Sequence, residues 1–558
     1  MKFIPRDPHK AYIDAFHWVP KHRVDVARTK RALMVTTGGI RGEIVAYNLW
    51  RETATHLIVP RAFFPPEVIG DTVDTRPQSY QRIQVRSRIT LDAKYPNETT
   101  QRDAVNALLR ANGGTLQLRC GGGKTVIALH LVAATQVPTL IVAPEGALLD
   151  QWRRAVEDYL ELPEGVGLIR GKIFDWQKPV VLATYTTLAN NAGSYPEEMR
   201  RWFGQVFYDE GHHLSAAKWC LAATIIYGKR FVLSATPERE DGTHLLAEAH
   251  CGPVLYKNLQ QPLKPTVEFV WTGFSLDLLD AGVASYVHDR TGEVHHGMLA
   301  RYLGHWQARN AYIVGMLREL IRGGRHVLYL GHSVEGLVNL LAEWVGAPAL
   351  NTLSKPTADE LGFVGIIPQE LSKKKIKELR EQIADMEETL RTLPAPSRAV
   401  QSRIDGKRQL LRAHDAFVAI RRAERKRLRA HLDHLIESSK DAGIIIGDVD
   451  EKERIRLLRE KQLVFAIYRI GQEGLDKGSL DTVVFGEPTK KPGIVQQVLG
   501  RVLRADENKQ APLGIVLEDN VMPYRRLCAG LRQLLTDWPE DSGGTIPYTL
   551  TGHPLWAQ

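Results

Sequence analysis

Cysteine is scarce in this chain, and its few cysteines lie far apart. The four among 558 residues are Cys120, Cys220, Cys251 and Cys528. No two of them have the CxxC spacing of a zinc site or redox motif, and four dispersed thiols make no disulfide framework. The sequence therefore gives no sign of a disulfide-stapled or zinc-dependent fold, and it fits a reducing compartment.

Long apolar runs are missing too. No stretch holds the roughly 18 consecutive apolar residues that a membrane-spanning helix requires. The opening residues, MKFIPRDPHK, lack the apolar centre of a secretory signal. We therefore expect no membrane association and a cytoplasmic location.

Basic residues outnumber acidic ones. The 73 Lys and Arg against 64 Asp and Glu give a formal net charge of +9. Such a balance favours polyanionic partners such as nucleic acids, although a bland basic surface has the same charge. The length and an ordinary hydrophobic content of 44% predict three or four globular units.

The most informative local pattern is a glycine-rich turn, LRCGGGKT, at positions 118–125. An apolar run before it predicts a strand end, and VIALHLVAA after it predicts a helix. A glycine-rich turn at a helix N-terminus directs backbone N–H groups at phosphate oxygens. We expect Lys124 to reach the β and γ phosphates and the Thr125 hydroxyl to ligate Mg²⁺, in a loop built by Gly121, Gly122 and Gly123.

Two other interpretations of this turn remain at this point. The usual phosphate-loop pattern has a glycine where this chain has Leu118, so the octapeptide can be a chance glycine-rich turn. Cys120 inside the loop can also be a nucleophile, but no base is identifiable beside it. The neighbouring motifs favour the phosphate loop.

Residues 1 to about 90 alternate short β-prone segments with Gly and Asn turns. They predict a small β-rich accessory unit. Its aromatic residues either stack on bases or form the core of that unit, and these are Trp18, Trp50, Phe63 and Phe64.

From position 96 the chain alternates strand and helix patterns, which is typical of a parallel sheet. The stretch that begins at Gln101 predicts a helix that ends at Gly113 and Gly114. VVLATYTTLAN, from Val180, predicts a strand with a polar end. The expected buried face of the helix consists of Ala104, Val105, Leu108 and Leu109.

A strand ending in two acids follows, QVFYDEGHH from Gln205. Because the carboxyl end of a parallel strand lies beside the phosphate loop, we expect Asp209 to hold Mg²⁺ and Glu210 to orient an attacking water. An ordinary strand end is the alternative. The next strand, RFVLSAT, ends in hydroxyls, and we expect Ser234 and Thr236 either to bond to these carboxylates or to cap a turn.

The order of these motifs resembles the first RecA-like lobe of superfamily 2 helicases. The segments that carry the resemblance are Gln101, LRCGGGKT, VAPEGALLDQW, ATYTTL, DEGH and SATPER. ATPER followed by Asp241 and Gly242 is most similar to the branch that includes XPB, RadD and the phage helicase UvsW. In the second half, RHVLYLGHSVEGLVNLLAEWVG resembles the first strand and helix of the second lobe, EGLDKGSLDTVVFGEP resembles motif V, and VQQVLGRVLRA is similar to motif VI.

The resemblance covers positions 95 to 517 and implies an ATP hydrolase, specifically an ATP-dependent DNA helicase or translocase, with ATP and Mg²⁺ between two lobes. It implies arginine fingers at Arg501 and Arg504, which need lobe closure to reach the phosphates. It further implies adenine recognition by Gln101, a lobe-interface role for Gln497, a coupling role for His212, and a motif V pair at Gly474 and Asp476. Tyr468 stands where motif V usually has a threonine that contacts the nucleic-acid backbone.

A long insertion after Gly346 departs from the family pattern. Apolar residues at alternating spacings of three and four predict a coiled-coil helix, and Pro394 and Pro396 end it. A second helix at 397–438 completes a predicted antiparallel coiled-coil hairpin. Its basic segments, SKKKIK and RRAERKRLRAH, indicate a DNA or protein contact, or else a solvated helix face. The apolar residues of the first helix are Ile376, Leu379, Ile383, Met386, Leu390 and Leu393.

We therefore expect an α/β protein with two RecA-like parallel-sheet lobes, a β-rich N-terminal unit and a coiled-coil insertion in the second lobe. The expected units are a β-rich unit at 1–92, a first lobe at 93–258, a second lobe at 259–520 interrupted by the hairpin at 371–438, and a helix with a loosely packed tail at 521–558.

The expected partner is single-stranded, forked or branched DNA, bound by a monomer that resides in the host cytoplasm if a phage encodes it. The hairpin can in addition bind a protein. The rival functions are an RNA helicase and a nucleotide-gated nucleic-acid clamp that unwinds little.

Overall fold

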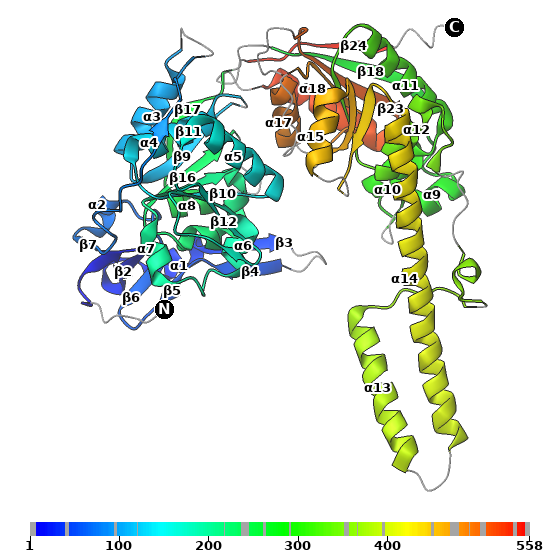
Figure 1. Cartoon of the computed structure of the whole chain (residues 1–558), viewed down its shortest axis with the longest axis horizontal. Helices are drawn as coiled ribbons and strands as arrows, with labels where there is room; N and C mark the ends of the chain where they lie inside the picture. The colour runs from blue at the N-terminus through cyan, green and yellow to red at the C-terminus, as the bar shows by residue number, and fades with distance from the viewer. Residues whose placement is uncertain are drawn as a thin grey trace.

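The computed structural model describes residues 7–38, 44–93, 98–119, 121–216, 218–235, 245–260, 264–288, 292–350, 357–364, 366–392, 397–447, 451–468, 479–489, 492–502, 509–538 and 544–552. Two α/β units stand side by side, a β-rich unit lies against the first, and two helices project from the second (Figure 1). Among the helices described, none combines the length and the apolar character that a membrane span needs.

The N-terminal unit is a small sheet with a separate hairpin. The hairpin pairs β3 (Met34–Gly38) with β4 (Ile44–Asn48). Trp18 is buried in the sheet, and its Nε1 donates to Asp14 Oδ2 at 2.9 Å. This ring therefore belongs to the core and is not available to stack on bases. The sheet has the order β5 (Arg51–Glu52), β6 (His56–Pro60), β2 (Phe16–Pro20), β1 (Ala11–Ile13), β7 (Thr72–Asp74).

Two buried arginines hold the N-terminal unit against the first α/β unit. Arg61 donates to the carbonyls of Tyr227 (2.7 Å) and Gly228 (2.8 Å). Arg230, from the other side, donates to the carbonyl of Ala15 at 2.8 Å. Because burial removes water from both guanidinium groups, it lowers the pKa of each. The contacts tie the two units together through backbone carbonyls.

The first α/β unit, hereafter the first lobe, contains an eight-stranded sheet. All neighbouring strands are parallel except β12 and β13. The central strands are buried apolar runs, as expected for a parallel sheet covered on both faces. The strand order is β13 (Ile173–Phe174), β12 (Val166–Arg170), β14 (Val180–Thr184), β10 (Thr139–Ala143), β15 (Gln205–Asp209), β16 (Lys229–Ser234), β9 (Gly113–Leu118), β17 (Val254–Asn258).

Two different sets of helices cover the two faces of this sheet. One face packs against α3 (Thr100–Arg110), α4 (Lys124–Thr135) and α5 (Gly146–Tyr159). The other packs against α6 (Tyr185–Asn190), α7 (Glu197–Trp202) and α8 (Leu245–Cys251). The chain thus builds a doubly covered parallel sheet, which is consistent with a RecA-like lobe.

Three local predictions for the first lobe were wrong. Helix α3 ends at Arg110, and Gly113 and Gly114 open β9, where a Cβ on Gly114 would lie 2.5 Å from Leu255 Cγ. Leu109 is 40% exposed instead of buried. The polar end of the predicted strand at Val180 is helix α6, capped by Thr184 Oγ1, which accepts from the N–H of Thr187. Close backbone packing and capping decide these details.

The second α/β unit, hereafter the second lobe, has seven strands, all parallel to their neighbours. Helices α15 (Glu451–Glu460), α17 (Pro492–Val502) and α18 (Met522–Thr536) cover one face, while α11 (Gln307–Arg322) and α12 (Val334–Val345) cover the other. The strand order is β20 (Ala442–Ile445), β21 (Leu463–Ile467), β19 (Val327–Gly331), β22 (Thr482–Phe485), β23 (Leu513–Asn520), β18 (Thr266–Ser275), β24 (Tyr548–Gly552).

Two predictions for the second lobe were wrong. The strand and helix β19 and α12 are not its first, because β18 precedes them in the chain and pairs with β23. The tail is not loosely packed throughout, since β24 pairs in parallel with β18 from Tyr548 to Gly552. The last described residues therefore complete the sheet.

A buried ion pair joins α11 to the end of β23. Arg309 Nη2 and Asp519 Oδ2 lie 2.9 Å apart, and both side chains are almost fully buried. Arg309 also donates to the carbonyl of Gly486 (2.8 Å), and Thr272 Oγ1 donates to Asp519 Oδ1 (2.6 Å). All these partners satisfy a charge that would otherwise be costly to bury.

Replacing Arg309 with alanine is expected to lower the free energy of unfolding by about 3–5 kcal/mol, because it leaves the Asp519 carboxylate buried without a cation. Urea denaturation followed by circular dichroism measures the change. The matched control is Arg322→Ala on the same helix, where the side chain is exposed and a change within about 0.5 kcal/mol is expected. Equal effects of the two substitutions would contradict this role.

Two helices project from the second lobe over the range of the predicted insertion. They are α13 (Lys373–Thr392) and α14 (Arg398–Ser438), which lie side by side and run in opposite directions (Figure 1). Leu432 and Leu435, near the end of α14, are buried in the core of the second lobe. The last turns of α14 therefore belong to the lobe. Pro394 and Pro396 lie outside the described residues.

Candidate nucleotide site

The turn between β9 and α4 is the predicted phosphate loop, and the conformation of its described residues favours glycine. Gly121 and Gly123 have positive φ angles of 76° and 86°, which favour glycine. Leu118 is the last residue of β9 and its side chain is buried in the core, so a glycine is not needed at this position. Lys124 Nζ donates to the carbonyls of Leu118 (3.2 Å) and Arg119 (3.4 Å). The ammonium group therefore lies over the loop.

Gln101 lies directly against this loop. A Cβ on Gly123 would come within 2.3 Å of Gln101 Nε2, so only glycine fits there. Asp92 fixes the glutamine: its N–H donates to Gln101 Oε1 (2.7 Å), and its Oδ1 accepts from the Gln101 N–H (2.8 Å). The amide is thus held with its NH₂ group toward the phosphate loop. Asp92, which has a positive φ of 60°, was not predicted as part of the site, because no motif surrounds it in the sequence.

The first acid of the predicted pair, Asp209, ends β15 and is fixed by two hydrogen bonds. Trp152 Nε1, from α5, donates to Asp209 Oδ2 at 2.8 Å, and the Glu210 N–H donates to Asp209 Oδ1 at 3.0 Å. Burial, and next to it the charge of Glu210, raise the pKa of Asp209 to about 6, although Lys124 opposes the shift. A nearby cation therefore stabilises the ionised form of Asp209. Trp152 belongs to the segment VAPEGALLDQW, but its hydrogen bond to Asp209 was not predicted from the sequence.

The second acid, Glu210, has an unusual backbone. Its φ of 47° and ψ of 52° lie in the left-handed region, where a residue with a Cβ is strained. The following Gly211 is required, because a Cβ there would lie 2.0 Å from Val232 Cγ1. His212 Nδ1 lies 3.5 Å from Glu210 Oε2. The tight turn thus orients the Glu210 carboxylate while His212 contacts it.

Aromatic residues support this turn from below. The Tyr185 hydroxyl donates to the carbonyl of Asp209 at 2.8 Å. The Tyr185 ring stacks on Trp219 at 5.9 Å between centroids, and Trp219 in turn lies 5.0 Å from His213. Strand order alone did not reveal this cluster, which connects the two acids to the helices on the other face of the sheet.

Ser234 ends β16, between the strand that carries the acids and the strand that carries the loop. Leu233 is paired with Asp209 on one side, and Ser234 is paired with Gln117 of β9 on the other. The Ser234 side chain is buried. Three neighbouring strands thus bring Ser234, Asp209 and the phosphate loop to one edge of the sheet, at the carboxyl ends where parallel sheets bind ligands.

These residues can accept a nucleotide with Mg²⁺. Thr125 opens α4 next to Lys124, and Asp209 supplies a carboxylate at the same sheet edge. Among the described residues no group of three or more His, Cys, Asp or Glu side chains is close enough to hold a metal alone. Mg²⁺ bound with a nucleotide needs only one or two carboxylates, because phosphates and water complete its octahedron. The donor set fits such an ion.

Several expected site residues are not placed by the structure. Thr236, Gly474, Asp476, Arg504 and Cys120 lie outside the described residues. Gln497 and Arg501 lie on helix α17, but their side chains are not described.

Tyr468 has an interior position in the second lobe. Its side chain is 4% exposed, its hydroxyl donates to the carbonyl of Glu487, and its ring stacks on His332 at 4.3 Å. Burial raises its pKa well above the usual range. The residue that replaces the motif V threonine therefore faces the protein, so it is not placed to contact a nucleic-acid backbone.

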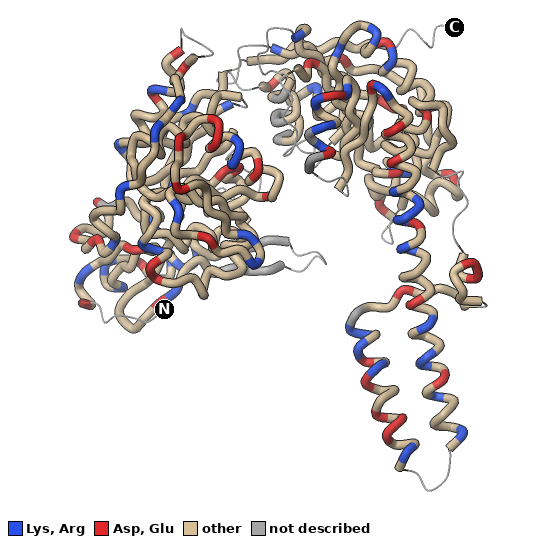
Figure 2. The backbone as a smooth tube through the Cα atoms, viewed as in Figure 1, with Lys and Arg blue, Asp and Glu red and all other residues tan. Residues whose placement is uncertain are grey.

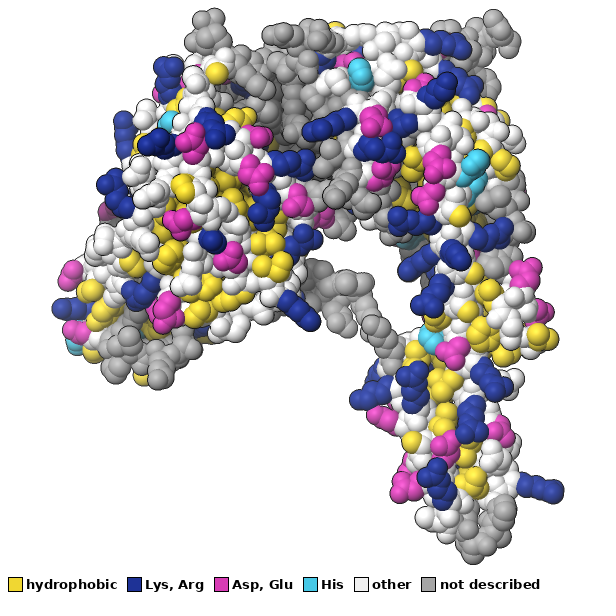
Figure 3. All heavy atoms as spheres, in the orientation of Figure 1, with side chains coloured by type: hydrophobic (Ala, Val, Ile, Leu, Met, Phe, Trp, Pro, Cys, Tyr) yellow, Lys and Arg dark blue, Asp and Glu magenta, His cyan; other side chains and the backbone are white. Residues whose placement is uncertain are grey.

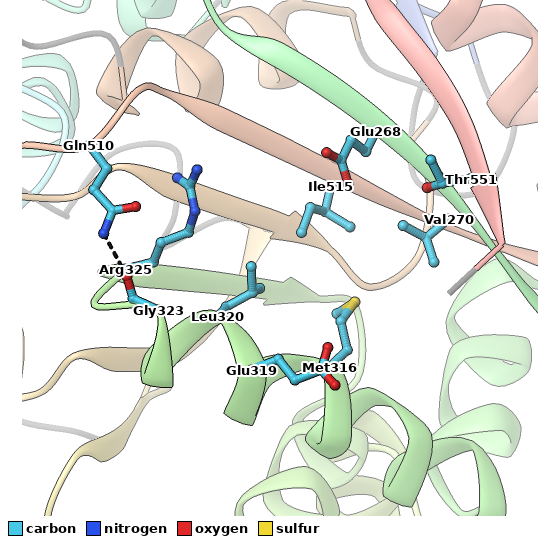
Figure 4. A pocket seen from close by; sticks show the side chains of 10 residues that line it. All are labelled: Glu268, Val270, Met316, Glu319, Leu320, Gly323, Arg325, Gln510, Ile515 and Thr551. Atoms are coloured by element: carbon cyan, nitrogen blue, oxygen red, sulfur yellow. Dashed lines mark hydrogen bonds between the residues drawn. The ribbon is translucent and has the colours of Figure 1, made fainter. Parts of the chain in front are cut away.

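A cavity of about 470 Å³ lies elsewhere in the second lobe, between the sheet and α11 (Figure 4). Arg325 and Gln510 line it and precede β19 and β23, so the cavity lies toward the amino ends of these strands. Gln510 Nε2 donates to the carbonyl of Gly323 at 2.7 Å. This position is opposite to the carboxyl ends where a nucleotide is expected, and the cavity is separate from the candidate site.

Comparison with known proteins gives relatives for the first lobe and beyond. Residues 94–239 match the family described as type III restriction enzyme, res subunit. The DNA 3'-5' translocase XPB2 of Sulfurisphaera tokodaii is 35% identical over 164 residues, which cover 29% of this chain and 36% of the relative. The DNA 3'-5' helicase XPB of Mycobacterium tuberculosis is 30% identical over 162 residues, or 28% of this chain and 29% of the relative.

The match to a viral relative covers a larger part of this chain. A putative ATP-dependent RNA helicase of Acanthamoeba polyphaga mimivirus is 23% identical over 301 residues, covering 53% of this chain and 56% of the relative. The chain thus matches only about a third to just over a half of the length of these relatives. XPB-like and viral helicases are therefore homologues of this chain, and the match to the restriction-enzyme family lies within residues 94–239.

Proposed function

We propose, with this homology as the premise, that the chain is an ATP-dependent DNA helicase or translocase. The observation that carries the proposal is the meeting of a phosphate loop, a lysine and two acids at one sheet edge, with Lys124 close enough to Asp209 to lower its pKa. Such a set binds a nucleoside triphosphate and positions a water for its hydrolysis.

Each candidate site residue of the first lobe has a role in this proposal. The backbone N–H groups of the loop and Lys124 hold the phosphates, and Gln101 presents its amide to the adenine. Thr125 and Asp209 hold Mg²⁺, which neutralises charge on the β and γ phosphates when it is bound. Glu210 orients the attacking water and accepts its proton. Ser234 and His212 transmit the state of this site to bound DNA.

The second lobe supplies the remaining charge. Arg501 and Arg504 act as arginine fingers on the γ phosphate, and Gln497 contacts the opposite lobe. Gly474 and Asp476 contact the nucleotide from the same side. Because these groups belong to the second lobe and Lys124 belongs to the first, hydrolysis requires the lobes to close, and opening after hydrolysis moves the chain along DNA.

Stimulation of ATP hydrolysis by nucleic acid tests the proposal. We expect single-stranded, forked and duplex DNA to raise the turnover of ATP, and RNA to have little effect. An RNA helicase is the second candidate, because a mimivirus relative carries that name. Stimulation by RNA alone would favour it and contradict DNA as the substrate.

The finer organisation is part of the proposal. We propose units at 1–92, 93–258, 259–520 and 521–558, with α13 and α14 forming an antiparallel coiled coil within 371–438, and a monomer as the working form. Support comes from Leu379, Ile383 and Ile404, which are buried on the paired part of the two helices. The burial of Leu432 and Leu435 in the second lobe moves the practical end of the hairpin to before residue 432.

Trp152→Phe is expected to move the acidic limb of the pH–rate profile for ATP hydrolysis upward by about one pH unit. The indole N–H stabilises the ionised form of Asp209, so its loss raises a pKa that is already about 6. A hydrogen bond to a charged group contributes about 1.5–3 kcal/mol, and one pKa unit corresponds to about 1.4 kcal/mol. Activity then falls below about pH 7, where the carboxyl binds a proton instead of Mg²⁺.

The matched control for this variant is Trp202→Phe. Trp202 lies on α7, against the other face of the sheet, and its Nε1 contacts the carbonyl of Lys178 at 3.5 Å. Its replacement should leave the acidic limb in place. An unchanged limb in Trp152→Phe would show that Asp209 does not govern the profile.

A further inference from the structure

Helix α14 carries a dense run of basic residues between the projecting hairpin and the second lobe. α13 begins beside His414, whose Nδ1 accepts from the Leu371 N–H at 3.2 Å, and α14 enters the lobe core at Leu432. We call residues 417–431, which lie between these points, the bridging segment. Six of the nine residues at 421–429 are basic and exposed, and these are Arg421, Arg422, Arg425, Lys426, Arg427 and Arg429. Figure 2 shows this part of α14 in blue, whereas α13 is a mixture of red and blue.

Two lysines of α13 have acidic partners on the same helix. Lys374 lies 4.0 Å from Glu378, and Lys377 lies 3.7 Å from Glu381. Opposite charges four residues apart are the ordinary pattern of a solvated helix face. These two lysines therefore need no external ligand to balance their charge.

The paired part of α14 follows the same pattern. Arg408 Nη2 lies 2.6 Å from Glu387 on α13, and Lys407 Nζ donates to Gln382 Oε1 at 2.6 Å. These contacts join the two helices and satisfy the charges between them.

The bridging segment has the denser run of basic residues. Within the described part of the chain, Arg422, Arg425 and Lys426 have no carboxylate at ion-pair distance. Arg421, by contrast, is paired with Glu424 at 3.9 Å. Like charges four residues apart, such as Arg422 and Lys426, destabilise a helix. Helix stability therefore does not account for this run.

Four basic residues form one stripe. Arg422 and Lys426 are four residues apart, as are Arg425 and Arg429, and the two pairs are offset by three, which places all four on one side of the helix. From residue 422 to residue 429 the stripe is about 10 Å long. Figure 3 shows dark-blue side chains gathered along α14 between the second lobe and the hairpin.

A groove of about 740 Å³ adjoins the stripe, between α14 and α15. Its outer end is basic, with Arg425, Lys426 and Arg429, while Asp433 and Glu437 lie nearer the lobe. The acidic residue from α15, Glu453, is paired with Arg456 at 2.6 Å. Arg425 and Lys426, which have no carboxylate at ion-pair distance among the described residues, therefore place positive charge at the outer end of the groove.

The lining of the groove also indicates which form of nucleic acid fits. Its described lining contains no aromatic side chain. Sites for single strands stack bases on aromatic rings, whereas contacts to the backbone of a duplex need only cations and polar groups. The groove has the cationic and polar lining that suits the backbone of a duplex.

We propose that the bridging segment and the outer end of this groove bind the phosphate backbone of duplex DNA next to the second lobe. The proposal rests on the proposed function, since it takes DNA as the substrate class. Contacts to the phosphates would hold the duplex beside the second lobe, and they do not depend on the base sequence of the DNA.

The test compares the affinity for a blunt DNA duplex and for a single strand of equal length, by fluorescence anisotropy over a range of salt. One variant combines Arg422→Ala, Arg425→Ala and Lys426→Ala, which keep a strong helix-forming residue at each position. We expect duplex binding to weaken about 10-fold or more at moderate salt. The slope of log K against log salt should fall by about 2 to 3, because each phosphate contact contributes about 0.9.

The matched control removes three charges from the outer part of the hairpin: Arg391→Ala, Arg398→Ala and Arg403→Ala, all exposed residues. On α14, Arg403 lies roughly 30 Å from Arg422. The control should retain duplex affinity and the salt slope. An equal loss in both variants would overturn the proposal in favour of diffuse attraction, no loss in the first variant would overturn it outright, and a loss confined to the single strand would exclude duplex as the ligand.

Hydrolysis of ATP without DNA, measured on the same preparations, separates this proposal from the proposed function. None of the three substituted residues is part of the nucleotide site, so the variant should hydrolyse ATP as the unaltered chain does. If the unaltered chain hydrolyses no ATP, the proposed function fails, while the difference in duplex affinity still decides the role of the bridging segment.

Discussion

Replacing Glu210 with glutamine is expected to lower the turnover number for DNA-stimulated ATP hydrolysis by about 10²- to 10⁴-fold, the contribution of a positioned general base. Glutamine keeps the size of the side chain but accepts no proton. The strained turn at φ 47° holds residue 210 in place through the packing of Gly211 on Val232, so the geometry should survive the change. Nucleotide binding should be retained, because Lys124 and the loop are unaltered.

Steady-state hydrolysis and binding of a fluorescent ATP analogue measure the two quantities separately. The matched control is Glu157→Gln, an exposed glutamate on α5, which should hydrolyse ATP at the unaltered rate. If Glu210→Gln turned ATP over normally, Glu210 would not be the base. The chain would then resemble a nucleotide-gated clamp more than a motor.

Replacing either Arg501 or Arg504 with alanine is expected to reduce the same rate by about 10³- to 10⁵-fold, the range known for an arginine finger. Both positions follow from motif VI, and Arg501 lies on α17, which packs on the second sheet. Lysine should restore little, because its single ammonium cannot form the planar, forked contact of a guanidinium with phosphate oxygens.

Arg526 on α18 supplies the control for this pair. It is exposed and lies on the same lobe, so Arg526→Ala should leave hydrolysis unchanged. A loss below about 10-fold in both Arg501→Ala and Arg504→Ala would remove the second lobe from the catalytic step. ATP would then be hydrolysed by the first lobe alone.

Much of the first lobe follows from local patterns. The phosphate loop, the strand that ends at Asp209 and the strand that ends at Ser234 were predicted from apolar runs followed by polar residues. Parallel pairing then explains why they meet, because carboxyl ends share one edge. The burial of Leu118 also explains why this turn accommodates a leucine where the phosphate-loop pattern has its first glycine.

The supporting contacts were not predictable in the same way. Asp92 and Trp152 hold Gln101 and Asp209 from 9 and 57 residues away in the chain, and no short motif records such pairs. The pairing of β24 with β18 is likewise a long-range contact, made by a short segment whose Gly and Pro neighbours suggested a loose tail. Tertiary packing decides these features, and local propensity does not.

The helices of the insertion show both sides of this limit. Their lengths follow from apolar spacing and two prolines, and α13 and α14 cover the expected range. The spacing did not show that Leu432 and Leu435 belong to the second lobe, because a helix that passes from one partner to another keeps its periodicity. The sequence alone did not distinguish the bridging segment from an ordinary charged helix face, because that distinction requires the ion pairs of the hairpin.

Displacement of a strand from forked DNA tests the central claim most directly. With ATP and Mg²⁺, the unaltered chain should release the labelled strand, and it should release none with a non-hydrolysable ATP analogue or after Lys124→Ala. If the unaltered chain bound the fork and hydrolysed ATP but neither displaced a strand nor moved along DNA in a triplex-displacement assay, the account of a DNA motor would be contradicted.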